Sequence, residues 1–157
     1  QTCYPVSASR MIFGDEPESL LCKIKINSET GVSVKVHMVL FYPGEKIAYA
    51  SSLFGSYYQS TYSVLGTRGH IRMGRAYAVP RDMGTKIFYD HDDKVEEISF
   101  EPVDHFRLMV DDFTAEIGKG LESQKNYEDD LLKEARVLEA ARISSNENRI
   151  VQISEIN

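Results

Sequence analysis

Residues 32–42 alternate between apolar and polar side chains, and this stretch constrains the fold more than any other part of the chain. An alternation with a period of two residues is typical of a β-strand that turns one face to a core. The apolar side comprises Val32, Val34, Val36, Met38 and Leu40, and the other side comprises Ser33, Lys35, His37, Val39 and Phe41. Because the second half is apolar on both sides, we expect a sheet that is covered on one face and partly covered on the other.

Six further segments have strand character and follow one another closely along the chain: residues 20–27, 46–54, 58–65, 70–77, 85–90 and 94–100. Turn-forming residues separate several of them, such as Pro43-Gly44 and the pair Gly66 and Gly69. Consecutive strands joined by short turns favour antiparallel pairing.

The hydrophobic period changes to that of a helix in three places. Residues 5–13 form the first expected helix, which Gly14 ends. Apolar residues then recur with helical spacing at Val103, Phe106, Met109, Val110, Phe113 and Ile117. Asn126 is expected to cap a third helix, followed by a loop over residues 144–148 and a strand over residues 149–154. This order predicts one α+β domain over residues 1–157, an open, mainly antiparallel β-sheet with helices packed on one face.

Charge and composition bound the possible functions of the 157 residues. The net charge is −6, and no apolar run approaches the roughly 18–20 residues of a membrane-spanning helix. The two cysteines, Cys3 and Cys22, lack zinc-ligand spacing. We therefore expect a cytoplasmic protein with reduced thiols, and neither nucleic acid nor a membrane as a partner.

The basic residues closest to a cluster lie between positions 68 and 81. We interpret them as solvated strand and loop positions, although one of them could contact an anionic substrate: Arg68, Arg72, Arg75 and Arg81. Tyr57, Tyr58 and Tyr62 lie in a stretch with Ser56, Gln59 and Ser60, a composition that suits a sugar site, a subunit interface or a plain strand surface.

Motifs for common chemistries are missing from the sequence. No complete dinucleotide-binding glycine pattern follows a strand, and the four histidines have no metal-ligand spacing. Asp104-His105 begins a helix just after the strand segments, so Asp104 is either a helix cap or, with His105, part of a cleft.

Tyr4 is the candidate catalytic residue. A phenol can donate a proton to a carbonyl oxygen while hydride arrives at carbon, but it needs a partner, and none is visible nearby in the sequence. The chain opens on Gln1, directly before a helical pattern, so we expect it to have been cut from a longer protein.

The order of several short motifs resembles the C-terminal domain of the glucose–fructose oxidoreductase/inositol dehydrogenase (Gfo/Idh/MocA) family. The motifs are Cys3-Tyr4-Pro5, Ser9-Arg10-Met11-Ile12-Phe13-Gly14-Asp15-Glu16-Pro17, Thr30-Gly31-Val32, Phe41-Tyr42-Pro43-Gly44, Ser51-Ser52, Val64-Leu65-Gly66-Thr67-Arg68-Gly69-His70-Ile71, Asp104-His105-Phe106, Asp112-Phe113, Glu134-Ala135-Arg136-Val137-Leu138-Glu139-Ala140 and Ser144-Ser145.

The resemblance implies that Tyr4 is the proton donor or acceptor and that an Asp directly precedes Gln1. Thr2 stands where the family commonly has Gly. Arg10 and His105 are expected to bind substrate. NAD or NADP is expected on a separate N-terminal Rossmann domain of the parent protein, and none on these residues alone.

Two functions follow as hypotheses. The first is the substrate-binding and dimer-forming domain of an NAD(P)-dependent oxidoreductase for a sugar, cyclitol or related polyol, with a homodimer formed through the open sheet face. The second is a non-enzymatic β-sheet module for oligomerisation or ligand binding.

Overall fold

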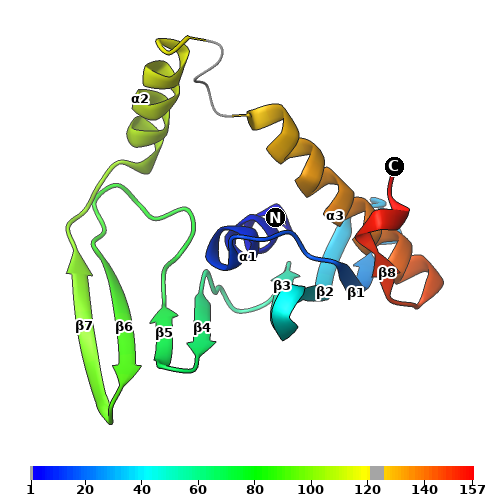
Figure 1. The fold of residues 1–157 in the computed structure, drawn as a ribbon, viewed down its shortest axis with the longest axis horizontal. Helices are drawn as coiled ribbons and strands as arrows, with labels where there is room; N and C mark the ends of the chain where they lie inside the picture. Colours follow the sequence, from blue (N-terminus) through cyan, green and yellow to red (C-terminus); the bar gives the residue numbers. More distant parts are fainter. Residues whose placement is uncertain (1, 121–125) are drawn as a thin grey trace. The chain divides into compact units, whose positions relative to one another are not determined.

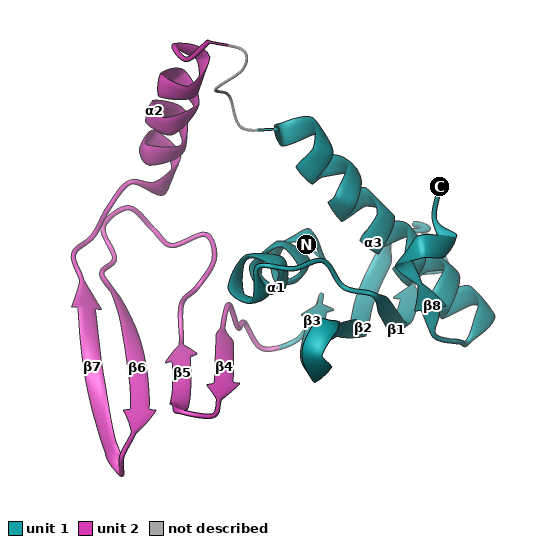
Figure 2. Ribbon diagram, in the orientation of Figure 1, with its two compact units in different colours: residues 1–56, 126–157 teal, residues 57–125 magenta. Residues whose placement is uncertain are grey.

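The computed structural model describes residues 2–120 and 126–157, and they form two compact units. The first unit joins Gln1–Ser56 to Asn126–Asn157, and the second comprises Tyr57–Lys125 (Figure 2). Both helices and antiparallel strands are present, which confirms the α+β prediction. The described strands form two four-stranded sheets, whereas one sheet was expected.

The sheet of the first unit has the strand order β3-β2-β1-β8 (Figure 1). Its strands are β1 (Ser19–Ile26), β2 (Ser33–Tyr42), β3 (Lys46–Leu53) and β8 (Val151–Gln152), and every pairing is antiparallel. The alternation predicted for residues 32–42 is confirmed, because Val36, Met38, Leu40 and Tyr42 are buried on one face of β2.

Helices α1 (Cys3–Phe13) and α3 (Tyr127–Glu147) cover that buried face. Val6 of α1 and Val137 of α3 join the β2 side chains and Leu20 in one apolar core. The prediction of helices on one face of a sheet therefore holds for this unit. Asn126 caps α3 as expected, since its side chain accepts a hydrogen bond from the backbone N–H of Asp129.

The predicted end of the third helix is wrong by about one turn, because α3 continues through residues 144–147. The reason is that β8 pairs with β1 only at Ser19 and Leu20. Beyond these residues the backbone N–H of Cys22 donates to Ser144 Oγ at 2.8 Å, and the N–H of Ile24 donates to Ser145 Oγ at 2.9 Å. Two serines that suggested a loop are the groups that bind α3 to the edge of β1.

The sheet of the second unit has the order β4-β5-β6-β7 and is a simple meander. Its strands are β4 (Tyr62–Gly66), β5 (Gly69–Met73), β6 (Thr85–His91) and β7 (Lys94–Phe100). Strand β4 begins later than the predicted residue 58, because the preceding residues pair only through a single bridge between Ser60 and Arg75.

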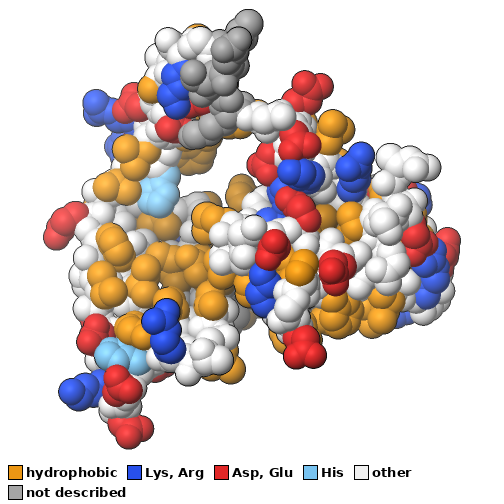
Figure 3. All heavy atoms as spheres, viewed as in Figure 1, with side chains coloured by type: hydrophobic (Ala, Val, Ile, Leu, Met, Phe, Trp, Pro, Cys, Tyr) orange, Lys and Arg blue, Asp and Glu red, His pale blue; other side chains and the backbone are white. Residues whose placement is uncertain are grey.

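This second sheet has one apolar and one charged face. The strand register places Ile71, Met73, Ile87 and Ile98 on one side, and Figure 3 shows apolar side chains over strands β5 to β7. The opposite side carries ion pairs, including Arg72 with Asp90 and Lys86 with Glu97.

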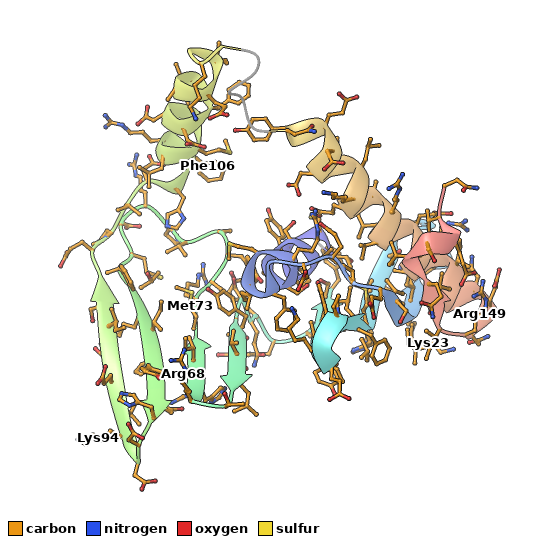
Figure 4. The ribbon with its side chains drawn as sticks, viewed as in Figure 1. Lys23, Arg68, Met73, Lys94, Phe106 and Arg149 are labelled. Atoms are coloured by element: carbon orange, nitrogen blue, oxygen red, sulfur yellow. The ribbon has the colours of Figure 1, made fainter. Side chains whose placement is uncertain are left out.

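Helix α2 (His105–Ile117) follows this sheet and begins at the predicted N-cap. Asp104 Oδ1 accepts hydrogen bonds from the backbone N–H groups of Phe106 and Arg107, both at 3.1 Å, so the cap interpretation is confirmed. The predicted apolar stripe is solvent-exposed in the described structure, and Phe106 alone is 73% exposed (Figure 4). The expectation of helices packed on a sheet therefore fails for α2.

Candidate functional site

Helix α1 presents Tyr4 to solvent in its first turn. The side chain is 53% exposed, and the helix begins at Cys3, directly after Thr2 at the cap position. Gly14 ends the helix in the left-handed conformation (φ 65°), with its N–H donating to Arg10 O. The buried Val6 fixes the orientation of α1 on the sheet. An exposed phenol on a fixed helix can reach a ligand, which is the geometry that a proton donor requires.

Arg10 lies two turns further along α1 and points elsewhere. A spacing of six residues at about 100° each places its side chain about 120° around the helix axis from Tyr4. Its side chain is 9% exposed. Nε and one terminal nitrogen donate to the two carboxylate oxygens of Glu16, at 2.7 and 2.8 Å, and the same terminal nitrogen donates to Asp130 at 2.7 Å.

This ion cluster joins three parts of the first unit: α1, the loop after it and α3. Glu134 of α3 completes it, lying 3.8 Å from the Arg10 guanidinium and accepting a 2.6 Å hydrogen bond from Ser7 Oγ. The hydrogen bond to Glu16 is the main cause that raises the pKa of Arg10 above its ordinary value. Arg10, predicted to bind substrate, is therefore a buried cation held by protein carboxylates.

An open hollow of about 450 Å³ lies over the cluster. Its lining is polar and of mixed charge, comprising Ser7, Arg10, Met11, Gly14, Asp15, Glu16, Asp130 and Lys133. Lys133 is itself bound to Asp129 at 2.7 Å. The carboxylates and the serine hydroxyl offer hydrogen-bond partners to a hydroxyl-rich ligand rather than a cationic site for an anion.

His105 is the first residue of α2 and is exposed. It belongs to the second compact unit, whereas Tyr4 and Arg10 belong to the first.

The run of arginines predicted as solvated positions divides into different environments. Arg72 makes a bidentate pair with Asp90, with both N···O distances at 2.9 Å, and it accounts for the lowered pKa of that carboxyl. Arg68 is exposed at the turn between β4 and β5 (Figure 4). Arg75 instead stacks on an aromatic ring, with its Cζ 4.6 Å from the ring centroid of Tyr58.

The tyrosine cluster expected from the sequence is also divided. Tyr58 faces Arg75, whereas Tyr62 lies against Tyr77 with ring centroids 6.2 Å apart. The contact between Tyr58 and Arg75, which lies 17 residues later, was not predicted from the sequence. The bridge between Ser60 and Arg75 brings the two segments together, and knowledge of that pairing would have revealed the contact.

The described residues hold neither a metal-ligand cluster nor a helix that could span a membrane. Residues 2–120 and 126–157 contain no group of three or more histidine, cysteine, aspartate or glutamate side chains that could hold a metal ion. Across the same residues, every helix is too short or too polar to cross a membrane.

Comparison with known families and proteins gives a consistent result. Residues 1–72 match the model of the GFO/IDH/MocA C-terminal domain, which confirms the resemblance predicted from the motifs. A dTDP-3,4-didehydro-2,6-dideoxy-alpha-D-glucose 3-reductase from Streptomyces antibioticus is 23% identical over 144 residues, covering 89% of this chain and 44% of that protein. A D-xylose 1-dehydrogenase (NADP(+)) from Haloferax volcanii is 27% identical over 118 residues, covering 75% and 36%.

Solved structures share the fold. The 3-ketoreductase KijD10 from Actinomadura kijaniata, crystallised with NADP and TDP-benzene, superposes with a TM-score of 0.82 at 19% identity, covering 91% of this chain and 44% of that one. An aldose-aldose oxidoreductase from Caulobacter crescentus, complexed with glycerol, gives a TM-score of 0.76 at 22% identity, covering 96% and 45%. The chain thus spans less than half the length of the relatives that it matches.

Proposed function

We propose that this chain, whose residues 1–72 match the GFO/IDH/MocA C-terminal domain, shapes the substrate pocket of an NAD(P)-dependent oxidoreductase acting on a sugar, cyclitol or related polyol. The observation that carries the proposal is the exposed phenol of Tyr4 in the first turn of a helix anchored on the core. Sugar oxidoreductases among the relatives support the same assignment.

The chemistry assigned to this chain is proton transfer. NAD or NADP, bound by a separate N-terminal domain of the whole protein, would exchange hydride with the carbinol carbon of the substrate. The Tyr4 hydroxyl would give a proton to the carbonyl oxygen during reduction and take it back during oxidation. An aspartate directly before Gln1 belongs to the same proposal.

Replacing Tyr4 with phenylalanine in the full-length gene product tests the assignment. We expect turnover to fall by about a hundredfold or more, the range for loss of a general acid, while affinity for the nicotinamide cofactor stays the same. Tyr127→Phe is the matched control, because Tyr127 is also about half exposed in the first turn of a helix. Equal turnover of the Tyr4 variant and the control would refute the assignment.

Arg10 and His105 have different roles in this proposal. His105 would contact the substrate directly because it is exposed at the start of α2, so His105→Ala should raise KM more than it lowers kcat. Arg10 would act indirectly, because it holds Glu16 and Asp130 in place where they line the hollow.

We also propose that residues 1–157 alone bind no dinucleotide. Tight NADH binding by the 157-residue chain would contradict that part.

A homodimer is the proposed assembly, formed through the open face of the first unit's sheet. This face carries exposed apolar side chains, with Leu21, Ile47 and Tyr49 at 37%, 44% and 80% exposure, and exposed apolar patches favour isologous pairing. Tyr49→Lys should shift the sedimentation coefficient from dimer to monomer. An unchanged coefficient would place the interface elsewhere.

The alternative is a non-enzymatic sheet module for oligomerisation or ligand binding, which the same exposed face favours. If the full-length protein reduces and oxidises no sugar or polyol while the Tyr49 variant loses assembly, the module is the better description. A cytoplasmic location completes the proposal, in agreement with two unbridged cysteines, Cys3 and Cys22.

A further inference from the structure

Two loop segments of the second unit are bound tightly to each other next to Arg75. Ser60 Oγ donates to Tyr77 O at 2.9 Å and accepts from the Tyr77 N–H at 3.0 Å, and the Ala76 N–H donates to Ser60 O at 2.6 Å. Ser60 is 9% exposed. These bonds to the two residues that follow Arg75 fix its backbone, although it lies beyond the end of β5 at Met73 (Figure 4).

The fixed backbone holds the Arg75 guanidinium over the Tyr58 ring, 4.6 Å from the centroid. Its Nε is buried and has no hydrogen-bond partner among the described residues. A buried N–H donor without a partner costs free energy, typically about 1–3 kcal/mol. A side chain held in this way keeps an unused donor, together with a full positive charge, at one fixed place.

Arg75 differs from the arginines that are held by carboxylates. Five of the nine arginines form such ion pairs: Arg10, Arg72, Arg107, Arg142 and Arg149. Within residues 2–120 and 126–157, Arg75 stacks on Tyr58 and forms no ion pair, although the chain has six more acidic than basic residues. A stacked guanidinium without a counter-charge is the group that proteins use for bidentate binding of phosphate or carboxylate.

We propose that Arg75 and Tyr58 form a binding site for an oxyanion carried on a sugar ring. The guanidinium would bind the phosphate or carboxylate oxygens through its terminal N–H groups, because Nε is closed off from solvent. The Tyr58 ring is 60% exposed, so it also offers an apolar surface to the sugar carbons. The inference that the ligand contains a sugar rests on the proposed function. The inference that it carries an oxyanion rests on Arg75 alone.

Binding is measured on the 157-residue chain without any nicotinamide cofactor, so the result does not depend on catalysis. Three probes separate the possible ligands: glucose 1-phosphate, glucuronate and glucose. The arginine Nε–H signals in ¹H–¹⁵N NMR spectra report which side chain is engaged. We expect either anionic sugar to shift the Arg75 signal and to bind more tightly than glucose, with the tighter of the two identifying phosphate or carboxylate.

Charge-matched variants then test the site. Arg75→Gln should weaken binding of the anionic sugar by about tenfold or more, the loss expected for a charge-assisted hydrogen bond. Arg81→Gln removes the same charge from an exposed position and should change affinity by less than about twofold. If Arg75→Gln does not fold, Tyr58→Ala against Tyr58→Phe gives the same test, because only the first removes the ring.

Two results would overturn the site. One is the absence of any shift of the Arg75 Nε–H signal with both anionic sugars. The other is equal loss of binding in the Arg75 and Arg81 variants, which would mean non-specific attraction. Failure of the Tyr4 assignment leaves this test intact, because no turnover is measured.

Discussion

Arg10 shows at the residue scale how a side chain expected at a ligand site can instead hold the protein together. Its side chain is 9% exposed and binds Glu16 and Asp130, whose side chains are 42% and 70% exposed. Charged hydrogen bonds of this kind contribute more than ordinary surface ion pairs because one partner is shielded from water. The cluster therefore sets the position of α1, the helix that carries Tyr4.

Arg10→Gln should lower the free energy of unfolding by about 2 kcal/mol, because it leaves Glu16, Asp130 and Glu134 together without their cation. The measurement is urea unfolding followed by circular dichroism. Arg142→Gln breaks an exposed pair with Glu139, and we expect a clearly smaller loss, because water screens this pair. Equal losses in the two variants would show that the Arg10 cluster behaves as an ordinary surface pair.

Cys22 makes the free energy of unfolding depend on pH in the alkaline range. Burial raises the pKa of its thiol to about 11, so the folded state keeps the proton at a pH where the unfolded chain has lost it. The stabilisation is complete below the ordinary thiol pKa, about 8.5, and is lost as pH rises toward 11. The free energy of unfolding should fall by up to about 1.4 kcal/mol per pH unit in this window.

Urea unfolding between pH 8 and about pH 10 measures the effect of Cys22 before the tyrosines titrate strongly. This limit is needed because burial also raises the pKa of Tyr42, which acts in the same direction at higher pH. Cys22→Ala should flatten the slope, because it removes the buried thiol. A wild-type slope retained in the Cys22 variant would assign the pH dependence to other groups.

Residue-scale predictions from the sequence succeed where the determinants are local. Asp104 and Asn126 cap helices, and Gly14 ends one, because each role depends on residues within about four positions. The partners of Arg10 include Asp130, 120 positions away, and the Tyr58–Arg75 contact depends on a strand pairing. Such contacts follow from tertiary packing, so local patterns could not reveal them.

At the scale of elements, the contacts between α3 and β1 explain why a last strand of only two residues is enough to complete the edge of the first sheet. Strand β8 pairs with β1 at only two residues, and the serine hydroxyls of α3 bond the next outward-facing N–H groups. The sequence predicted β2 within one residue because its pattern records burial directly. It ended α3 too early because serine and asparagine are common in loops, while here tertiary hydrogen bonds keep Ser144 and Ser145 helical.

Ser144→Ala should lower the free energy of unfolding by about 1–3 kcal/mol, because it leaves a buried Cys22 N–H without an acceptor. Ser144 is fully buried and its hydroxyl also donates to Arg149 O at 2.6 Å. Ser145→Ala is the matched control: water can reach the Ile24 N–H at this partly exposed position, so we expect a smaller loss. A larger loss for Ser145→Ala than for Ser144→Ala in urea unfolding would contradict this view of the edge.

At the scale of the whole molecule, the buried apolar residues are distributed unequally between the two units. The core cluster of twelve buried apolar residues lies entirely in the first unit. In the described part of the second unit, Val79 is the buried apolar residue. Every residue of β7 is exposed, and so is most of the apolar stripe of α2. The order of the helical and strand segments predicted the α+β class, but the difference between the units depends on what covers each sheet face, which alternation alone does not specify.

Native-state hydrogen exchange should therefore protect the first unit more strongly than the second. Strands β2 and β6 are a matched pair, because each lies inside a four-stranded sheet with a neighbour on both sides. Amides of β6 should exchange faster than those of β2, because few buried contacts oppose local opening of the second unit. Equal protection of the two strands would show that the second unit is stable without further cover.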